Sequence, residues 1–200
     1  DYVADFNPSD GLRDNPDKDL ALLRLASPAS LSARVATVNI AGLPSVGTDL
    51  TVVGWGRTAE DEPGSNVLRK AEVPVVSAAQ CSAAYPGGTT NNMFCAGYAQ
   101  GEVDSCTGDS GGPIFRSNSG QWEQVGIVSW GYGCAREDRY GVYTEVADFS
   151  AWLIEHIPTR DTRKALGWAF VDSSVNTPSI YSYPAGNTVS RTATGVYRVT

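Results

Sequence analysis

A serine placed among glycines marks the stretch of the sequence best suited to chemistry, GEVDSCTGDSGGP at residues 101–113. Glycines such as Gly108 allow backbone angles that other residues avoid, so this loop can turn sharply and present Ser110 at its apex. Asp109 directly precedes the serine, and Asp104 lies six residues before it. A serine hydroxyl attacks well only when a base takes its proton and an acid orients that base. The stretch therefore predicts a nucleophile loop whose base and acid come from elsewhere.

The residues after Ser110 separate two classes of hydrolase that place a serine between glycines. Residues 108–112 fit the G-x-S-x-G elbow of the α/β-hydrolases, which must lead directly into a helix. Here Gly-Gly-Pro follows the serine and makes a poor first helical turn, and Ile114 and Phe115 then indicate the start of a strand. This context excludes the elbow.

The other class carries a resemblance that extends well beyond the serine. The segment CTGDSGGP, residues 106–113, resembles the nucleophile segment of the trypsin-like serine proteases, which have the chymotrypsin fold. Further motifs of that family follow in order over residues 1–157, namely DLALLRL at 19–25, GWG at 54–56, Cys81, Cys95, SWG at 129–131, GC at 133–134, GVY at 141–143 and the segment 149–157. A lone GDSGG would be moderate evidence, whereas the ordered series identifies the chain as a member of this family.

The resemblance implies a role for each matching residue in peptide hydrolysis. Ser110 is the expected nucleophile and Asp19 the acid that orients the base, with Ser129 hydrogen-bonded to Asp19. The N–H groups of Gly108 and Ser110 are expected to form the oxyanion hole. Taken singly, Asp19 would be a solvated strand start and Ser110 an ordinary turn residue. The other motifs favour the catalytic interpretation of both.

The same resemblance places Asp104 at the base of the pocket that receives the side chain before the scissile bond. The expected substrate-binding residues around it are Ser105, Ser129, Trp130, Gly131 and Gly141. A buried carboxylate is costly unless it is paired, so an Arg or Lys side chain is favoured. The expected partners are therefore polypeptides with Arg or Lys before the scissile bond, together with protein inhibitors of proteases.

Two further residues have roles that the resemblance alone suggests. Asp109 is expected to pair with the N-terminal amine that zymogen cleavage releases, and this pairing orders the pocket. Tyr140 stands where some relatives with a tyrosine have a sodium site, although a packing role explains it equally well.

Composition limits the partners of the chain. The 200 residues have a net charge of −7 and a pI near 4.6, which argues against binding to nucleic acid or anionic membranes. No apolar run approaches the roughly 18 residues that a membrane helix needs. We expect neither a metal nor another cofactor.

The four cysteines and one histidine do not have the spacing of a zinc site. Disulfides are the better interpretation, and the sequence alone leaves all three pairings open. The resemblance implies Cys81 with Cys95 and Cys106 with Cys134. Such bridges form in oxidising compartments, so we expect a secreted, extracellular protein.

The patterning predicts an all-β fold, a double Greek-key barrel of the chymotrypsin type with a C-terminal helix and a β-rich tail. The expected strands are 20–25, 49–54, 70–76, 93–97, 112–116, 123–130 and 141–145. Phe149, Trp152, Leu153 and Ile157 share one face of a predicted helix over 148–157, which Asp148 can cap.

The predicted domains are a remnant of the first barrel at 1–26, a crossing between barrels at 27–45, and a second barrel plus helix at 46–157. Residues 158–200 are expected to begin an appended β-rich module or extension. Within it, residues 181–183 and 195–200 alternate like the two strands of a hairpin.

The general base that the proposed catalytic residues require is missing from the sequence. The family's histidine lies in an Ala-Ala-His-Cys segment before the Asp19 motif, and no such segment occurs in residues 1–18. His156 is the only histidine, and its apolar neighbours favour a structural role. We expect a protease zymogen whose first barrel is truncated in this chain, which alone would be inactive. The alternative is a non-catalytic relative that acts as a binding or adhesion protein.

Overall fold

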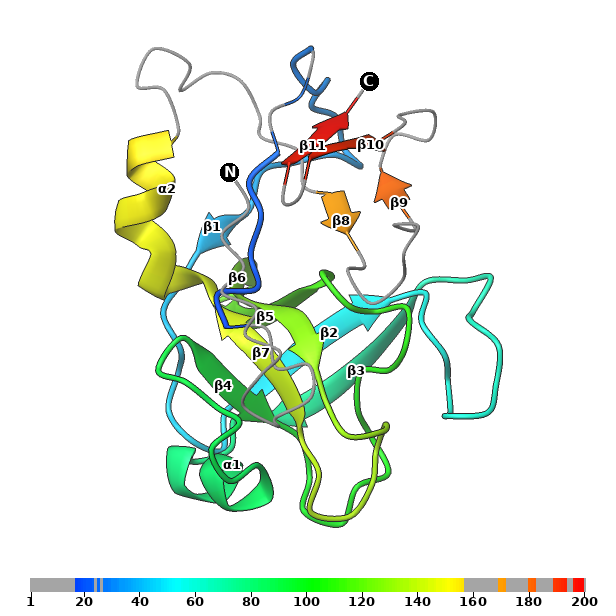
Figure 1. Cartoon of the computed structure of the whole chain (residues 1–200), viewed down its shortest axis with the longest axis vertical. Helices are drawn as coiled ribbons and strands as arrows, with labels where there is room; N and C mark the ends of the chain where they lie inside the picture. The colour runs from blue at the N-terminus through cyan, green and yellow to red at the C-terminus, as the bar shows by residue number, and fades with distance from the viewer. Residues whose placement is uncertain are drawn as a thin grey trace.

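The computed structural model describes residues 17–23, 25 and 27–156, and beyond them the backbone of four short strands. Predictions that concern residues 1–16, Ile157 or the rest of the tail lie outside the described residues. The described chain is built around one strongly curved sheet, with helical segments at its margins (Figure 1).

The sheet has seven strands, and six of them run antiparallel to their neighbours in the order β3-β2-β5-β6-β7-β4. These six are β2 (Asp49–Gly54), β3 (Arg69–Pro74), β4 (Met93–Ala96), β5 (Pro113–Asn118), β6 (Gln121–Trp130) and β7 (Gly141–Glu145). The seventh, β1 (Asn39–Ile40), pairs in parallel with β6. The predicted strands from 49 to 145 therefore exist, with ends shifted by at most two residues.

The sheet curls until its two outer strands meet. Val75, just after β3, forms a bridge with Ala96 at the end of β4. Two backbone hydrogen bonds flank the bridge, from Val76 N to Cys95 O at 2.9 Å and from Gly97 N to Pro74 O at 3.0 Å. This short join closes the sheet into a barrel.

Alternation along the strands fills the interior of the barrel. Leu50, Val73, Ile114 and Val125 are fully buried, and the stacked rings of Phe94 and Tyr143 lie in the same cluster. Each fully buried aliphatic side chain stabilises the fold by about 1.5–3 kcal/mol. Cys95 and Val142 alternate with this cluster along β4 and β7 and belong to a second buried cluster, so these two strands are covered on both faces.

The C-terminal helix begins later than predicted. A 3₁₀ turn, η1 (Val146–Phe149), precedes α2 (Ser150–His156), so Asp148 lies within η1 and does not cap the α-helix. Leu153 of α2 packs against Val146 and Leu20. The structure also contains α1 (Ala78–Ala84), which the patterning did not predict; Ser77 caps it by accepting a hydrogen bond from Gln80 N.

The predicted strand at 20–25 is wrong for the described residues of that stretch. Leu20 is buried against Val146 and Leu153, but no described strand pairs with residues 20–23. A strand needs a neighbour to satisfy its backbone groups, and apolar content alone does not supply one.

The predicted pairing in the tail is also wrong. Strand β9 (Ile180–Ser182) pairs with β8 (Ala169–Val171), and β11 (Val196–Val199) pairs with β10 (Val189–Ala193). The tail thus has two separate antiparallel pairs instead of one hairpin that joins residues 181–183 to 195–200. Each strand pairs with a strand close to it in sequence, because closing a shorter loop costs less conformational entropy.

No helix in the part of the chain described here has the length and apolar character needed to cross a membrane.

Candidate active site

The loop that carries Ser110 is held against β6 by its own backbone. Gly111 N donates to Val128 O at 2.7 Å, and Val128 N donates to Gly112 O at 2.9 Å. Gly111 has a φ of 73°, and Gly108, two residues before the serine, has a φ of 98°. Both values are in the region that favours glycine, so the sharp turn at Ser110 depends on these glycines.

Asp109 is bound by two backbone N–H groups. Its Oδ1 accepts from Gly56 N at 2.8 Å and its Oδ2 accepts from Cys106 N at 3.0 Å. A Cβ at Gly54 or Gly56 would overlap the carboxylate, which explains why GWG and not a bulkier sequence faces this aspartate. The structure thus gives Asp109 a defined position directly before the serine.

Asp19 is attached to the barrel through its side chain and its backbone. Ser129 Oγ donates to Asp19 Oδ2 at 2.8 Å, which confirms the hydrogen bond that the sequence predicted. Thr144 Oγ1 donates to the Asp19 carbonyl at 3.0 Å. Since Ser129 follows Val128 in β6, the Ser110 loop and Asp19 are anchored at neighbouring positions of one strand.

Asp104 is a partly buried carboxylate with backbone donors on both oxygens. Oδ1 accepts from Ser105 N at 2.8 Å, and Oδ2 accepts from Ala135 N at 3.1 Å. Burial raises the pKa of Asp104 to about 6, against the lowering effect of these two N–H groups. A Cβ at Gly141 would lie 2.7 Å from Oδ1, so glycine at 141 keeps space open beside the carboxylate.

Tyr143 is a site residue that the sequence interpretation missed. Its fully buried hydroxyl lies 3.1 Å from Ser105 Oγ, and a Cβ at Gly141 would lie 2.9 Å from it. Burial raises the pKa of the Tyr143 phenol, so this hydroxyl stays neutral. The signal was present in the sequence, because residues two apart on strand β7 share a face and Gly141 had already been assigned to the pocket.

Aromatic side chains surround Trp130, one of the predicted pocket residues. The ring of Tyr85 lies 4.8 Å from that of Trp130 in an edge arrangement, and the ring of Tyr132 lies 5.9 Å away. Tyr85 Oη donates to the carbonyl of Tyr140 at 2.6 Å, and Tyr140 itself is buried. Among the described residues no group of three or more His, Cys, Asp and Glu could hold a metal ion. The burial of Tyr140 fits the packing role, one of the two interpretations of this tyrosine.

Both predicted disulfides are present. Cys81 pairs with Cys95, at a Cα–Cα distance of 5.6 Å, and links α1 to β4. Cys106 pairs with Cys134, at 5.3 Å, and links the loop before Ser110 to the segment after Gly131. This second bridge joins the two stretches that bracket Asp104.

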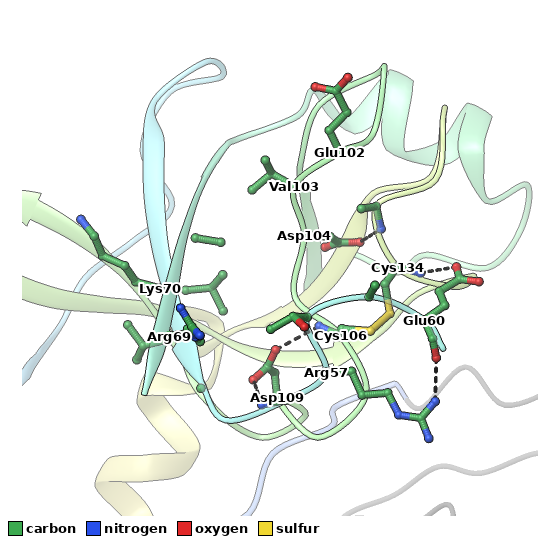
Figure 2. Close-up of a pocket in the computed structure, with 18 residues that line it drawn as sticks. Arg57, Glu60, Arg69, Lys70, Glu102, Val103, Asp104, Cys106, Asp109 and Cys134 are labelled. Carbon is green, nitrogen blue, oxygen red and sulfur yellow. Dashed lines mark hydrogen bonds between the residues drawn. A yellow bond between two sulfur atoms is a disulfide. The ribbon is translucent and has the colours of Figure 1, made fainter. Parts of the chain in front are cut away.

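A charged cleft of about 600 Å³ opens beside these residues (Figure 2). Asp104, Asp109 and the Cys106–Cys134 bridge line it on one side, and Arg69 and Lys70 of β3 line it on the other. Ser110 and Asp19 are not among the residues of its lining. The structure therefore brings Asp104 and Asp109 into one cleft, while the predicted nucleophile loop and the predicted acid attach to β6.

His156 lies in α2. Its Nδ1 is 2.8 Å from the Trp152 carbonyl oxygen, and its ring centroid is 4.7 Å from that of Trp152. These contacts belong to the helix and fit the structural role that the sequence suggested.

Comparison with known proteins gives the wider context of this geometry. Residues 3–153 match the family model described as Trypsin. The chain is 45% identical to anionic trypsin of Canis lupus familiaris over 141 residues, which are 68% of this chain and 55% of the relative. It is 46% identical to trypsin of Xenopus laevis, with 68% and 56% covered, and 42% identical to trypsin-3 of Homo sapiens, with 72% and 47% covered. The chain thus spans about half the length of these relatives.

Proposed function

The chain belongs to the trypsin family of serine proteases, and from this we propose that the complete protein is a secreted endopeptidase that cleaves peptide bonds after arginine and lysine. The observation that supports the specificity is the partly buried carboxylate of Asp104, whose pKa is raised by desolvation and which lies beside Gly141. An arginine or lysine side chain that enters this space places its positive charge next to the carboxylate and compensates the negative charge.

The proposed reaction is acyl transfer to Ser110. Its Oγ attacks the scissile carbonyl carbon while a histidine supplied from outside these 200 residues takes the hydroxyl proton, and Asp19 orients that histidine. The N–H groups of Gly108 and Ser110 donate to the oxyanion, where a single donor is typically worth about 3 to 4 kcal/mol of barrier. The amine leaves with the proton from the histidine, and water then hydrolyses the acyl-enzyme by the same route.

The position of Asp109 supports a route of activation. We propose that an N-terminal amine released by cleavage of a precursor pairs with Asp109, whose carboxylate faces the cleft beside Gly56. The two disulfides support secretion, because such bridges persist in oxidising compartments. Protein inhibitors of proteases are the expected partners of the mature enzyme, besides its polypeptide substrates.

The test is a substrate series on the activated full-length protein. We expect kcat/KM to be at least about 100-fold higher for esters with arginine or lysine than for neutral analogues, because a neutral side chain leaves Asp104 uncompensated. Ser110→Ala should lower kcat by a factor on the order of 10⁶. Equal rates for arginyl and neutral esters would reject the specificity, and unchanged turnover in Ser110→Ala would reject the mechanism.

The second candidate is a non-catalytic relative that acts as a binding protein. The supporting observation is that the only histidine of these 200 residues lies in α2 and contacts Trp152. The coding sequence upstream separates the two candidates. A histidine segment and an Ile-Val-type start after a basic cleavage site favour the enzyme, and their absence favours the binding protein.

A further inference from the structure

The loop at residues 57–62 contacts the nucleophile loop at one end. Arg57 N donates to Thr107 O at 2.9 Å, so the loop is attached one residue before Gly108. Arg57 Nη1 then donates to the carbonyl of Glu60 at 2.7 Å, which fixes the loop's own curvature (Figure 2). These two hydrogen bonds fix the position of the Glu60 backbone relative to the nucleophile loop.

The side chain of Glu60 reaches in the other direction, to the wall of the specificity pocket. Its Oε1 accepts from Cys134 N at 2.7 Å and from Arg136 Nε at 2.6 Å, and its Oε2 accepts from Arg136 Nη2 at 2.8 Å. Gly133 has a φ of 78°, and a Cβ there would overlap both the Glu60 carboxylate and the Arg136 guanidinium. Glycine at 133 is thus what lets the carboxylate reach a backbone N–H.

Ala135, which follows Cys134 in the pocket wall, is hydrogen-bonded directly to Asp104. Ala135 N donates to Asp104 Oδ2 at 3.1 Å, and Ala135 O accepts from Glu102 N at 3.0 Å. Ala135 has a φ of 55°, a left-handed conformation that is strained for a residue with a side chain. Such a conformation persists only where neighbouring contacts hold it, and the Glu60 contacts lie on either side of it.

We propose that Glu60 is a positioning residue of the specificity pocket: its carboxylate holds Cys134 and Arg136 so that Ala135 N–H stays on Asp104. The proposal rests on the proposed function for its catalytic readout. Glu60 itself does not touch substrate, and it acts through the wall segment 133–136.

The contact differs from an ordinary surface ion pair. Exposed pairs contribute little to stability because water competes for both partners. Here the same carboxylate also accepts from the backbone N–H of Cys134, and the Arg136 side chain binds it through two nitrogens. These bonds lower the pKa of Glu60 to about 2, so the carboxylate stays charged over the whole working range of a secreted protease.

The kinetic test uses Glu60→Ala in the activated full-length protein, with Glu62→Gln as the matched control. Glu62 is an exposed acid of the same loop, and its change removes an equal charge. We expect Glu60→Ala to raise KM for arginyl substrates about tenfold with kcat changed less than twofold, because the pocket carboxylate and not the nucleophile is disturbed. The control should match the wild type.

A second measurement does not depend on catalysis. Carboxyl ¹³C NMR follows the titration of Asp104 in the wild type, Glu60→Ala, Glu60→Gln and the control. Loss of the Ala135 N–H should raise the pKa of Asp104 in both Glu60 variants, because this N–H lowers it in the wild type. The other titratable groups that face Asp104 are Asp109 and the hydroxyls of Tyr85 and Tyr143, and none of them is changed.

The outcomes separate the two proposals. An unchanged Asp104 titration together with unchanged KM in folded Glu60 variants overturns the role of Glu60. A wild type that does not prefer arginyl substrates overturns the proposed function, while the NMR titration still decides whether Glu60 positions the wall. If Glu60→Ala does not fold, the kinetic assay and the NMR titration are both made on Glu60→Gln, which keeps the side-chain volume.

Discussion

Asp104 is held between two backbone N–H donors in a partly buried site. Desolvation opposes its charge and raises its pKa to about 6, whereas an aspartate in the unfolded chain titrates near 3.8. The folded state therefore binds the proton more tightly than the unfolded state does. Stability contributed by the protonated form is fully present below pH 4 and is lost as the pH rises through about 6.

Asp104→Asn removes this pH dependence, so its unfolding free energy relative to the wild type should rise by up to roughly 3 kcal/mol between pH 3.5 and pH 8, since a shift of one pKa unit corresponds to about 1.4 kcal/mol. A constant loss adds to this at both pH values, because the Asn amide nitrogen cannot accept one of the two backbone N–H groups that Asp104 accepts. Urea denaturation of both full-length proteins at the two pH values measures the change. A difference between variant and wild type that is the same at pH 3.5 and pH 8 would contradict it.

Single residues of the site were predictable to the extent that they stand in a motif. Ser110, Asp104 and Asp109 lie within one contiguous segment, and the Ser129 bond to Asp19 followed from the resemblance. Tyr143 and Glu60 were not predicted. Their roles depend on partners 38 and 74 residues away in sequence, which only the closed barrel brings into contact.

At the level of elements, the two disulfides should differ in function more than in stability. Their cysteines are separated by 14 and 28 residues, which on the loop-entropy model corresponds to about 3 and 3.5 kcal/mol of stabilisation. The Cys81–Cys95 bridge links α1 to β4, whereas Cys106–Cys134 joins the two segments that bind Asp104.

We therefore expect both double Cys→Ser variants to lose about 3 kcal/mol of unfolding free energy. Only the Cys106/Cys134 variant should also lose its preference for arginyl over neutral substrates. Denaturation and substrate series on the two full-length variants test this. Equal loss of selectivity in both would show that the second bridge has no special role in the pocket.

The strands β2 to β7 were predictable because each is a short run with strand-like composition between turn residues, although β4 and most of β7 are buried without alternation. The elements that sequence patterns missed depend on neighbours. Residues 20–25 have strand-like composition but no described partner strand, and α1 is too short and too rich in alanine to show a helical period. Asp148 resembled a cap only because the 3₁₀ turn before α2 could not be foreseen.

For the whole molecule, the proposed catalysis requires a base in addition to the residues of the described barrel. The barrel positions Asp19 and the Ser110 loop, and the proposed base lies outside these 200 residues. The 200-residue chain alone should therefore not be labelled by an organophosphate at Ser110, whereas the activated full-length protein should be. Mass spectrometry of the serine peptide distinguishes the two, and labelling of the short chain at a normal protease rate would refute a base supplied from outside.

The closure of the barrel between β3 and β4 has a consequence for its motions. Strands β2 and β3 share six paired positions, but the join between Val75 and Ala96 is one bridge with two flanking hydrogen bonds. Local opening begins where the fewest backbone bonds must break, so this join is the natural starting point for amide exchange with solvent. The Cys81–Cys95 bridge covers one end of it, which means that reduction would lower the protection of β4 before that of the pocket.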